Sequence, residues 1–183
     1  MKRIADFLFE TNMLKELTRT GYAFLGAGRE TVAEHSFMTA MICFAISRIE
    51  SGIDTEKLIT MALIHDIPEA RTGDMNYVQK KYVTVLEIKA SEDMADGLPF
   101  GKEMLSLLKE FNDAETREAM LARDADQLSF IIELKKYHDT GEKSPAKWLP
   151  FIIERLKTDT GKKLAQSIMD SKWDDWWFSD YSE

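Results

Sequence analysis

The chain has 183 residues, 44% of them hydrophobic and 31% charged, with a formal net charge of −8 at pH 7. This composition is typical of one globular domain and excludes a largely disordered chain. So acidic a sequence without a basic stripe also excludes a nucleic acid polymer as the main partner, because nothing offsets the repulsion from a polyanion.

The first predicted element is a helix whose apolar residues recur at helical spacing, as in Ile4, Phe7, Leu8 and then Leu14 and Leu17. Acidic and polar residues follow too soon for a secretory signal, and no apolar run approaches the ~20 residues of a membrane span. We therefore expect a cytoplasmic protein without a membrane partner.

A second helix is expected from Thr31 to about Glu50. Thr31 can cap it while Glu34, three residues on, reaches back in a capping box, and Gly52 would end it. The helix contains the only cysteine, Cys43, which excludes an intramolecular disulfide and whose apolar neighbours favour a buried, inert thiol. We predict that the apolar face of this helix carries Phe37, Met41, Phe44 and Ala45.

Asp54 is a good N-cap for a third helix, whose apolar face includes Leu58, Met61, Ala62 and Ile64. Pro68 cannot donate the hydrogen bond that continues a helix, and it biases Ile67 away from helical angles. The helix should therefore end or kink near Asp66. His65 and Asp66 would then lie at a helix end that faces a cleft.

The remaining sequence keeps the helical spacing of apolar residues and shows no convincing run of period-two alternation. Further helices are expected at residues 82–94, 102–110, 114–137, 145–157 and 162–172. The chain is thus predicted to be a single all-α domain over residues 1–183, in which residues 145–183 form C-terminal helices and an aromatic tail. We expect this tail to pack across the body or at a homodimer seam, through Trp173, Trp176, Trp177 and Phe178.

Two of the three histidines, His35 and His65, stand on apolar helix faces, and Asp66 directly follows His65. Singly, such a histidine is more often a satisfied core side chain. Together, these groups are costly to bury unless a cation compensates them, and a divalent metal ion is the simplest such cation. Asp124 and Asp126 offer a fourth ligand. They lie about 200° apart around a helix, so one should face the cleft and the other should be solvated.

Three stretches of sequence resemble a known family. Residues 30–37 and 65–74 are similar to motifs of the HD-domain metal-dependent phosphohydrolases, especially the 5′-deoxynucleotidase branch. Residues 19–22 are similar to the Arg-x-Gly-aromatic element of that branch. The resemblance covers about residues 14–137 and implies an HD-domain helical bundle and a homodimer. It also implies Asp126 as the distal metal ligand, together with His35, His65 and Asp66.

Two imidazoles and two carboxylates suit one divalent metal ion, such as Co, Mn, Zn, Ni, Fe or Mg. Such an ion activates water and polarises a phosphoryl oxygen, so hydrolysis of a phosphate ester needs no covalent intermediate. Glu69 is placed to orient or deprotonate the water, or to protonate the leaving oxygen. By the resemblance, Asp74 is a catalytic or sugar-contacting carboxylate and Arg19 binds phosphate. Alone, these residues would suit a turn cap and a surface arginine.

The residues therefore predict a phosphohydrolase that removes the 5′-phosphate from a small nucleotide, by the resemblance a deoxyribonucleoside 5′-monophosphate. A nucleoside di- or triphosphate is an alternative substrate, which the lack of a Lys/Arg cluster around His65 disfavours. A non-catalytic nucleotide or metal sensor with the same ligands is a second alternative. His138 is the only further histidine, so relatives with two metal ions, which use additional histidines, fit less well.

Overall fold

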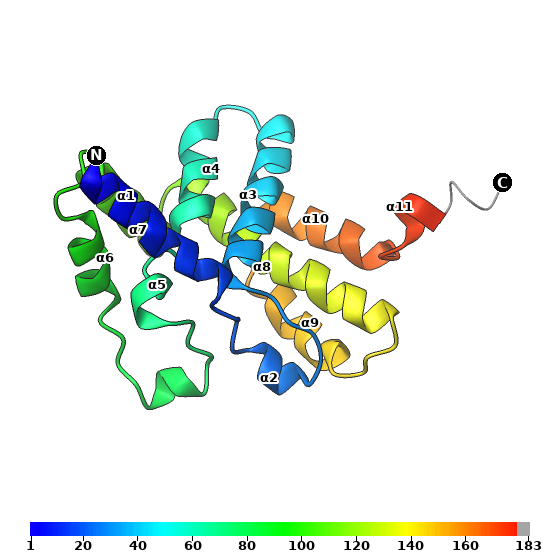
Figure 1. The fold of residues 1–183 in the computed structure, drawn as a ribbon. Helices are drawn as coiled ribbons and strands as arrows, with labels where there is room; N and C mark the ends of the chain where they lie inside the picture. The colour runs from blue at the N-terminus through cyan, green and yellow to red at the C-terminus, as the bar shows by residue number, and fades with distance from the viewer. Residues whose placement is uncertain (179–183) are drawn as a thin grey trace.

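The structure, a computed structural model, describes residues 1–178. Within this range it consists of helices and loops, with one isolated backbone bridge between Thr18 and Thr31 (Figure 1). The prediction of an all-α fold is confirmed. The end of the predicted tail, residues 179–183, lies outside the described residues. None of the described helices combines the length and the hydropathy that crossing a membrane requires.

The helices follow one another as α1 (Lys2–Asn12), η1 (Met13–Lys15), α2 (Tyr22–Leu25), α3 (Val32–Ile49), α4 (Thr55–Ile64), α5 (Glu69–Thr72), η2 (Gln79–Lys81), α6 (Glu87–Ala95), α7 (Gly101–Asp113), α8 (Arg117–Asp139), α9 (Pro145–Ile153), α10 (Asp159–Asp170) and α11 (Asp175–Phe178).

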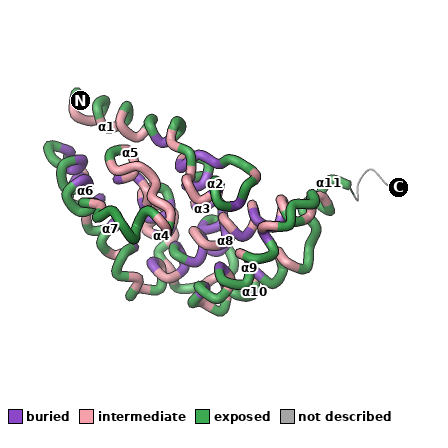
Figure 2. The backbone as a smooth tube through the Cα atoms, turned by 90° about the horizontal axis from the view of Figure 1, so that it is seen from below, coloured by how far each residue is buried: buried purple, intermediate pink, exposed green. Residues whose placement is uncertain are grey.

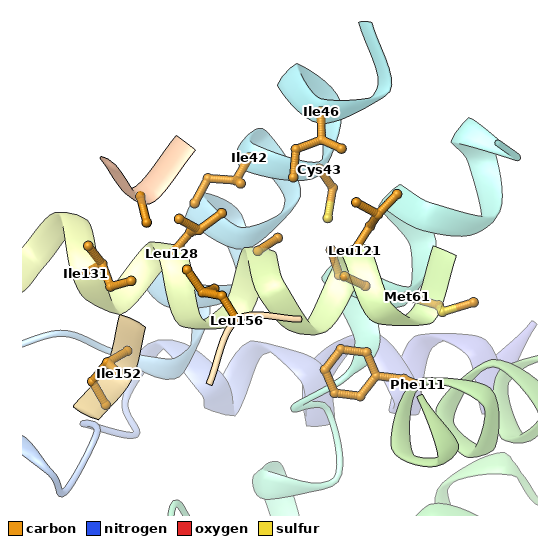
Figure 3. Close-up of a cluster of buried hydrophobic side chains, with 14 of the residues drawn as sticks. Ile42, Cys43, Ile46, Met61, Phe111, Leu121, Leu128, Ile131, Ile152 and Leu156 are labelled. Carbon is orange, nitrogen blue, oxygen red and sulfur yellow. The ribbon is translucent and has the colours of Figure 1, made fainter. Parts of the chain in front are cut away.

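Helix α8, with 23 residues, is the centre of the bundle. It packs against α3, α4, α7, α9 and α10, and α3 also packs against α4. Figure 2 shows buried segments concentrated along α8 and on the inner turns of its neighbours. The close-up in Figure 3 shows side chains of α8 meeting those of α3, including Leu121, Leu128, Ile131, Ile42, Cys43 and Ile46. The three helices α3, α4 and α8 thus pack together at the core of the fold.

The predicted helix starts are confirmed where the sequence holds a cap. The Thr31 side chain accepts a hydrogen bond from the backbone N–H of Glu34, whose carboxylate accepts one from the N–H of Thr31. The Asp54 carboxylate likewise accepts from the N–H of Lys57 at the start of α4. Helix α4 ends at Ile64, close to the predicted break before Pro68.

The predicted core-facing side of α3 is wrong. Phe37, Met41 and Phe44 are 63%, 45% and 46% exposed, and Ala45 is exposed as well. The buried side carries His35, Thr39, Ile42, Cys43 and Ile46. Apolar residues surround nearly the whole helix, so their spacing alone does not identify the side that meets α4 and α8. Cys43 is fully buried as predicted, and burial raises the pKa of its thiol to about 12.

Some helix boundaries also differ from the prediction. Helix α6 begins at Glu87 instead of at Tyr82, because Val83, Thr84 and Val85 are β-branched residues with low helix propensity. Helix α9 ends at Ile153, and α10 begins at Asp159 behind a cap at Thr158. The last predicted helix therefore starts and ends earlier than expected.

The start of the aromatic tail is attached to the end of α8. The backbone N–H of Trp173 donates a hydrogen bond to the carboxylate of Asp139 at 3.1 Å. Trp176 is 78% exposed, and α11 extends beyond the end of α10 (Figure 1). Trp176 is thus not buried against the body, and its predicted alternative place at a homodimer seam stays a prediction.

Candidate metal centre

Two buried imidazoles meet where α3 and α4 pack together. His35 lies in the first turn of α3, directly after the capping box, and His65 immediately follows the last residue of α4. Their ring centroids are 5.4 Å apart. Both side chains are almost completely buried. The packing of two neighbouring helices therefore brings together histidines that are 30 residues apart in sequence.

Two carboxylates approach these imidazoles. Asp126 of α8 places its Oδ1 atom 3.0 Å from Nε2 of His35. Asp66 places its Oδ2 atom 3.1 Å from Nε2 of His65 and 3.7 Å from Nε2 of His35. One ligand atom each from His35, His65 and Asp126 lies within 4.8 Å of the other two. The structure thus brings all four side chains of the predicted ligand set to one place.

The hydrogen bond of the His65 imidazole points the right atom at the site of a metal ion. Nδ1 of His65 lies 2.8 Å from the carbonyl oxygen of Ala62, so this nitrogen is the donor and Nε2 faces the carboxylates. Nδ1 of His35 lies 3.2 Å from the hydroxyl of Ser129. Both Nε2 atoms are buried without a hydrogen-bond partner among the described residues. Unpartnered buried nitrogens beside carboxylates fit a divalent cation.

The charges in the cluster also favour a cation. Burial opposes the charged form of His65, but the carboxylates of Asp66 and Asp126 outweigh this and raise the pKa of the imidazole to about 9. Burial likewise works to raise the pKa of Asp126, but the adjacent imidazole of His35 and the charges of His65 and Arg19 outweigh it, so the pKa falls below its usual range. The cluster therefore stabilises positive charge among its side chains.

Asp124 corrects one prediction, because it is not solvated. Its side chain is 1% exposed and accepts hydrogen bonds from the N–H of Lys157 and from the N–H and hydroxyl of Thr158, at 2.7 to 2.8 Å. It fixes the loop between α9 and α10 against α8. The side of α8 that carries Asp124, which faces away from the metal centre, is thus buried and not exposed to solvent.

Glu69 begins α5, and its backbone N–H donates to the carbonyl oxygen of Asp66 at 3.0 Å. Its Oε2 atom is buried, and no described residue forms a hydrogen bond with it. Burial, helped by the charges of Asp66 and Asp74, raises the pKa of this carboxyl to about 9. Glu69 is therefore a half-buried carboxyl beside Asp66 whose pKa is raised.

A cleft of about 750 Å³ opens beside Asp126. Arg19 and Asp74 also line it, and the hydroxyl of Thr20 donates a hydrogen bond to Oδ2 of Asp74 at 2.8 Å. Asp74 therefore holds the turn at Thr20 next to the cleft. The other lining residues include the aromatic side chains of Tyr22, Tyr77, Phe130, Trp148 and Phe151.

A family model described as the HD domain matches residues 11–169. The chain belongs to the HD-domain family. It is 31% identical to a 5′-deoxynucleotidase HDDC2 from Dictyostelium discoideum, over 79% of this chain and 80% of that protein, and 25% identical to the human 5′-deoxynucleotidase HDDC2, over 78% and 72%. A conserved hypothetical protein from Pyrococcus furiosus has a similar structure, with a TM-score of 0.76 and 28% identity, covering 91% of this chain and 99% of that one.

In this HD domain a buried glutamate holds Arg19 at the cleft. Glu30 is 6% exposed, and its Oε2 lies 3.4 Å from Nη1 of Arg19 and accepts a hydrogen bond from the hydroxyl of Tyr22 at 3.0 Å. The same Arg19 nitrogen contacts Nδ1 of His35. The N–H of Arg19 also donates to the carbonyl oxygen of Glu30 at 2.9 Å. Both the backbone and the side chain of Glu30 therefore fix the position of Arg19.

The sequence prediction assigned no role to Glu30 or to Ser129. Glu30 stands within the motif of residues 30–37, and this position was the only signal. Ser129 follows Asp126 by three residues, which places it on the same side of α8, and this spacing would have pointed to the cluster. Neither residue carries a chemistry that distinguishes it from ordinary helix-end and helix-interior residues.

Proposed function

We propose that this HD-domain protein is a metal-dependent phosphohydrolase that removes the 5′-phosphate from a deoxyribonucleoside 5′-monophosphate. The observation that carries the proposal is the pair of unpartnered imidazole nitrogens of His35 and His65, buried beside two carboxylates at a cleft. The names of the similar proteins, 5′-deoxynucleotidases, support the choice of substrate. The whole chain, residues 1–183, would act as one HD domain.

We propose that one divalent ion, of Co, Mn, Zn, Ni, Fe or Mg, is held by His35, His65, Asp66 and Asp126. When bound, this ion supplies a Lewis acid that polarises the phosphate and lowers the pKa of water toward neutrality. The buried nitrogens favour the transition metals among these ions, because imidazole suits Zn, Fe and Ni better than Mg.

The remaining polar residues at the cleft would bind and orient the substrate. The carboxylate of Glu30 holds the guanidinium of Arg19, whose central carbon lies 5.6 Å from the ring centroid of Phe130. In this position Arg19 would bind the phosphate of the substrate. Glu69 would exchange a proton with the reacting water or the leaving oxygen, because its backbone is hydrogen-bonded to that of the ligand Asp66 and its carboxylate atom Oε2 is buried. Asp74, fixed by Thr20, contacts the sugar, and the aromatic lining accommodates the base.

A phosphate-release panel tests the proposed function. Nucleoside mono-, di- and triphosphates, in ribo and deoxy forms, are incubated with Co, Mn, Mg and Zn supplied separately, and inorganic phosphate is measured. We expect deoxyribonucleoside 5′-monophosphates to give the highest rates. Besides Arg19, the cationic side chains of Lys80, Lys147 and Arg155 line the cleft and would attract any nucleotide. Preferred release from a triphosphate would therefore change the proposed substrate to a nucleoside triphosphate. No release from any substrate would favour the sensor alternative.

Metal binding can be measured without activity, by thermal unfolding of chelator-treated protein with each metal added. A ligand at about 100 times its Kd stabilises the folded state by ~2.7 kcal/mol, which raises the Tm of a domain of this size by about 5–10 °C. We expect His65→Asn to abolish this rise. His138→Asn is the matched control, since His138 lies exposed at the end of α8, and it should keep the rise in full. An equal rise in both variants would contradict the proposed ligand set.

Glu30→Gln is expected to act on the reaction through Arg19. The neutral amide keeps the shape of the side chain but loses the charge that holds the guanidinium, so KM should rise by about 10-fold with little change in kcat. Arg19→Ala should lower kcat/KM by about 100-fold. Arg29→Ala, at the exposed neighbouring arginine, is the control and should change neither. The metal-dependent rise in Tm should persist in Glu30→Gln; its loss would mean that Glu30 acts on the metal centre instead.

We propose in addition that the protein acts in the cytoplasm as a homodimer. The exposed apolar residues on α3 support the dimer, because contiguous apolar surface commonly marks a contact with another chain.

A further inference from the structure

Helix α3 buries one side in the core and presents a second apolar side to solvent. This exposed side carries Phe37, Met41 and Phe44, together with Ala45. All four lie within about 60° of Met41 around the helix axis, since each residue turns the helix by about 100°. We call these four residues the α3 stripe. None of them contributes to the metal centre or the cleft, so the site leaves them without a role.

The α3 stripe is symmetric about Met41. Phe37 lies four residues before Met41, and Ala45 lies four residues after it. Phe44 lies three residues after Met41, and its counterpart three residues before Met41 is the partly buried Met38. If two such helices run antiparallel with Met41 facing Met41, each Phe37 meets the Ala45 of the other copy. A large residue then faces a small one, which is the condition for close helix packing.

The charges at the ends of the stripe follow the same symmetry. Glu34 and Arg48 are each exposed and lie seven residues, or two helical turns, from Met41 on the same side of α3. In the antiparallel arrangement the acidic Glu34 of one copy faces the basic Arg48 of the other, at both ends. The guanidinium of Arg48 lies over the ring of Phe44, at 4.9 Å, and so already points along the stripe. A parallel arrangement would instead place like charges opposite each other.

We propose that two copies of this chain pair through α3, antiparallel, with a two-fold axis at Met41. The inference deepens the proposed homodimer and rests on it, but it does not depend on the proposed catalysis. A second copy of this chain is the partner that fits the α3 stripe, because the stripe is complementary to itself in both its apolar residues and its charges. A crossing angle near 20° keeps the helices together over the two turns on either side of Met41 that the charge pairs require. The net charge of −8 disfavours an anionic membrane as the occupant.

Cysteine cross-linking tests the axis directly. In Met41→Cys the two new thiols face each other, so a short bis-maleimide should convert most of the protein to a covalent dimer. In Phe37→Cys the two thiols are offset by eight residues, about 12 Å along the helices, and should not be bridged. A mixture of Phe37→Cys with Ala45→Cys should give a covalent heterodimer. The wild-type chain is the background, because its only thiol, Cys43, is fully buried.

Sedimentation equilibrium tests the proposed homodimer separately from the proposed α3 interface. The wild type should have the mass of a dimer at micromolar concentration, and Met41→Glu should have the mass of a monomer while keeping its helical circular dichroism. Leu63→Glu, at an exposed apolar position on α4, is the control and should remain dimeric. A monomeric wild type would overturn both the homodimer and the proposed surface. A dimeric wild type that cross-links equally well through Phe37→Cys and Met41→Cys would overturn the surface alone, and neither result would bear on the phosphohydrolase activity.

Discussion

Replacing Asp126 with Asn should abolish phosphate release and metal-dependent stabilisation together. The carboxylate lies 3.0 Å from Nε2 of His35, and it is the only proposed ligand that α8 contributes. An amide oxygen carries no charge, so the cluster loses the anion that favours a cation there. Metal activation is worth several kcal/mol in a phosphate transfer, so kcat/KM should fall by about 1,000-fold or more. Phosphate release and the change in Tm with added metal measure both effects on the same sample.

Asp124→Asn is the matched control, two residues away on the same helix. Its carboxylate binds the backbone of Lys157 and Thr158 and not the cluster. Losing one of these hydrogen bonds to a charged group should cost about 1–3 kcal/mol of stability, seen as a lower Tm. The metal-dependent rise in Tm and the kcat should persist. If Asp124→Asn lost metal binding while Asp126→Asn kept it, the assignment of the distal ligand to Asp126 would be wrong.

The sequence identifies the metal ligands because their chemistry is scarce in this chain. Only three histidines exist, and His35 and His65 stand among apolar residues, where an imidazole needs a partner. The helix starts at Thr31 and Asp54 are equally visible, since a cap depends on neighbours three residues apart. Local sequence therefore predicts which helices carry the site and where those helices begin.

Features that depend on distant segments are not visible in this way. Glu30 reads as a surface residue until residues 18 and 31 pair and bring it against Arg19. Asp124 reads as solvated because the loop that covers it is more than 30 residues away. Sequence spacing cannot tell the buried side of α3 from the exposed one, because both sides are apolar. In each case the missing information is the identity of the segment that packs on the residue.

Glu69→Gln should lower kcat while leaving metal binding and KM almost unchanged. The glutamine has the same size, but it cannot give or accept the proton that the buried carboxyl exchanges. Loss of a general acid or base typically costs about 100- to 10,000-fold in rate. Within residues 1–178 the Oε2 atom of Glu69 has no hydrogen-bond partner, so the substitution breaks no hydrogen bond of that atom there. Phosphate release under saturating substrate gives kcat, and thermal unfolding with added metal gives the binding.

The comparison with Glu56→Gln, at an exposed glutamate of α4, makes this result specific. That variant should keep the wild-type kcat and the wild-type rise in Tm. A fall in metal binding in Glu69→Gln would mean that Glu69 supports the cluster instead of transferring a proton. Wild-type kcat in Glu69→Gln would remove Glu69 from the reaction. The proton would then have to pass through Asp74, which lines the cleft together with the proposed ligand Asp126. Thermal unfolding with added metal distinguishes these two outcomes. A role of Glu69 in supporting the cluster would reduce the metal-dependent rise in Tm, whereas wild-type kcat would come with an unchanged rise.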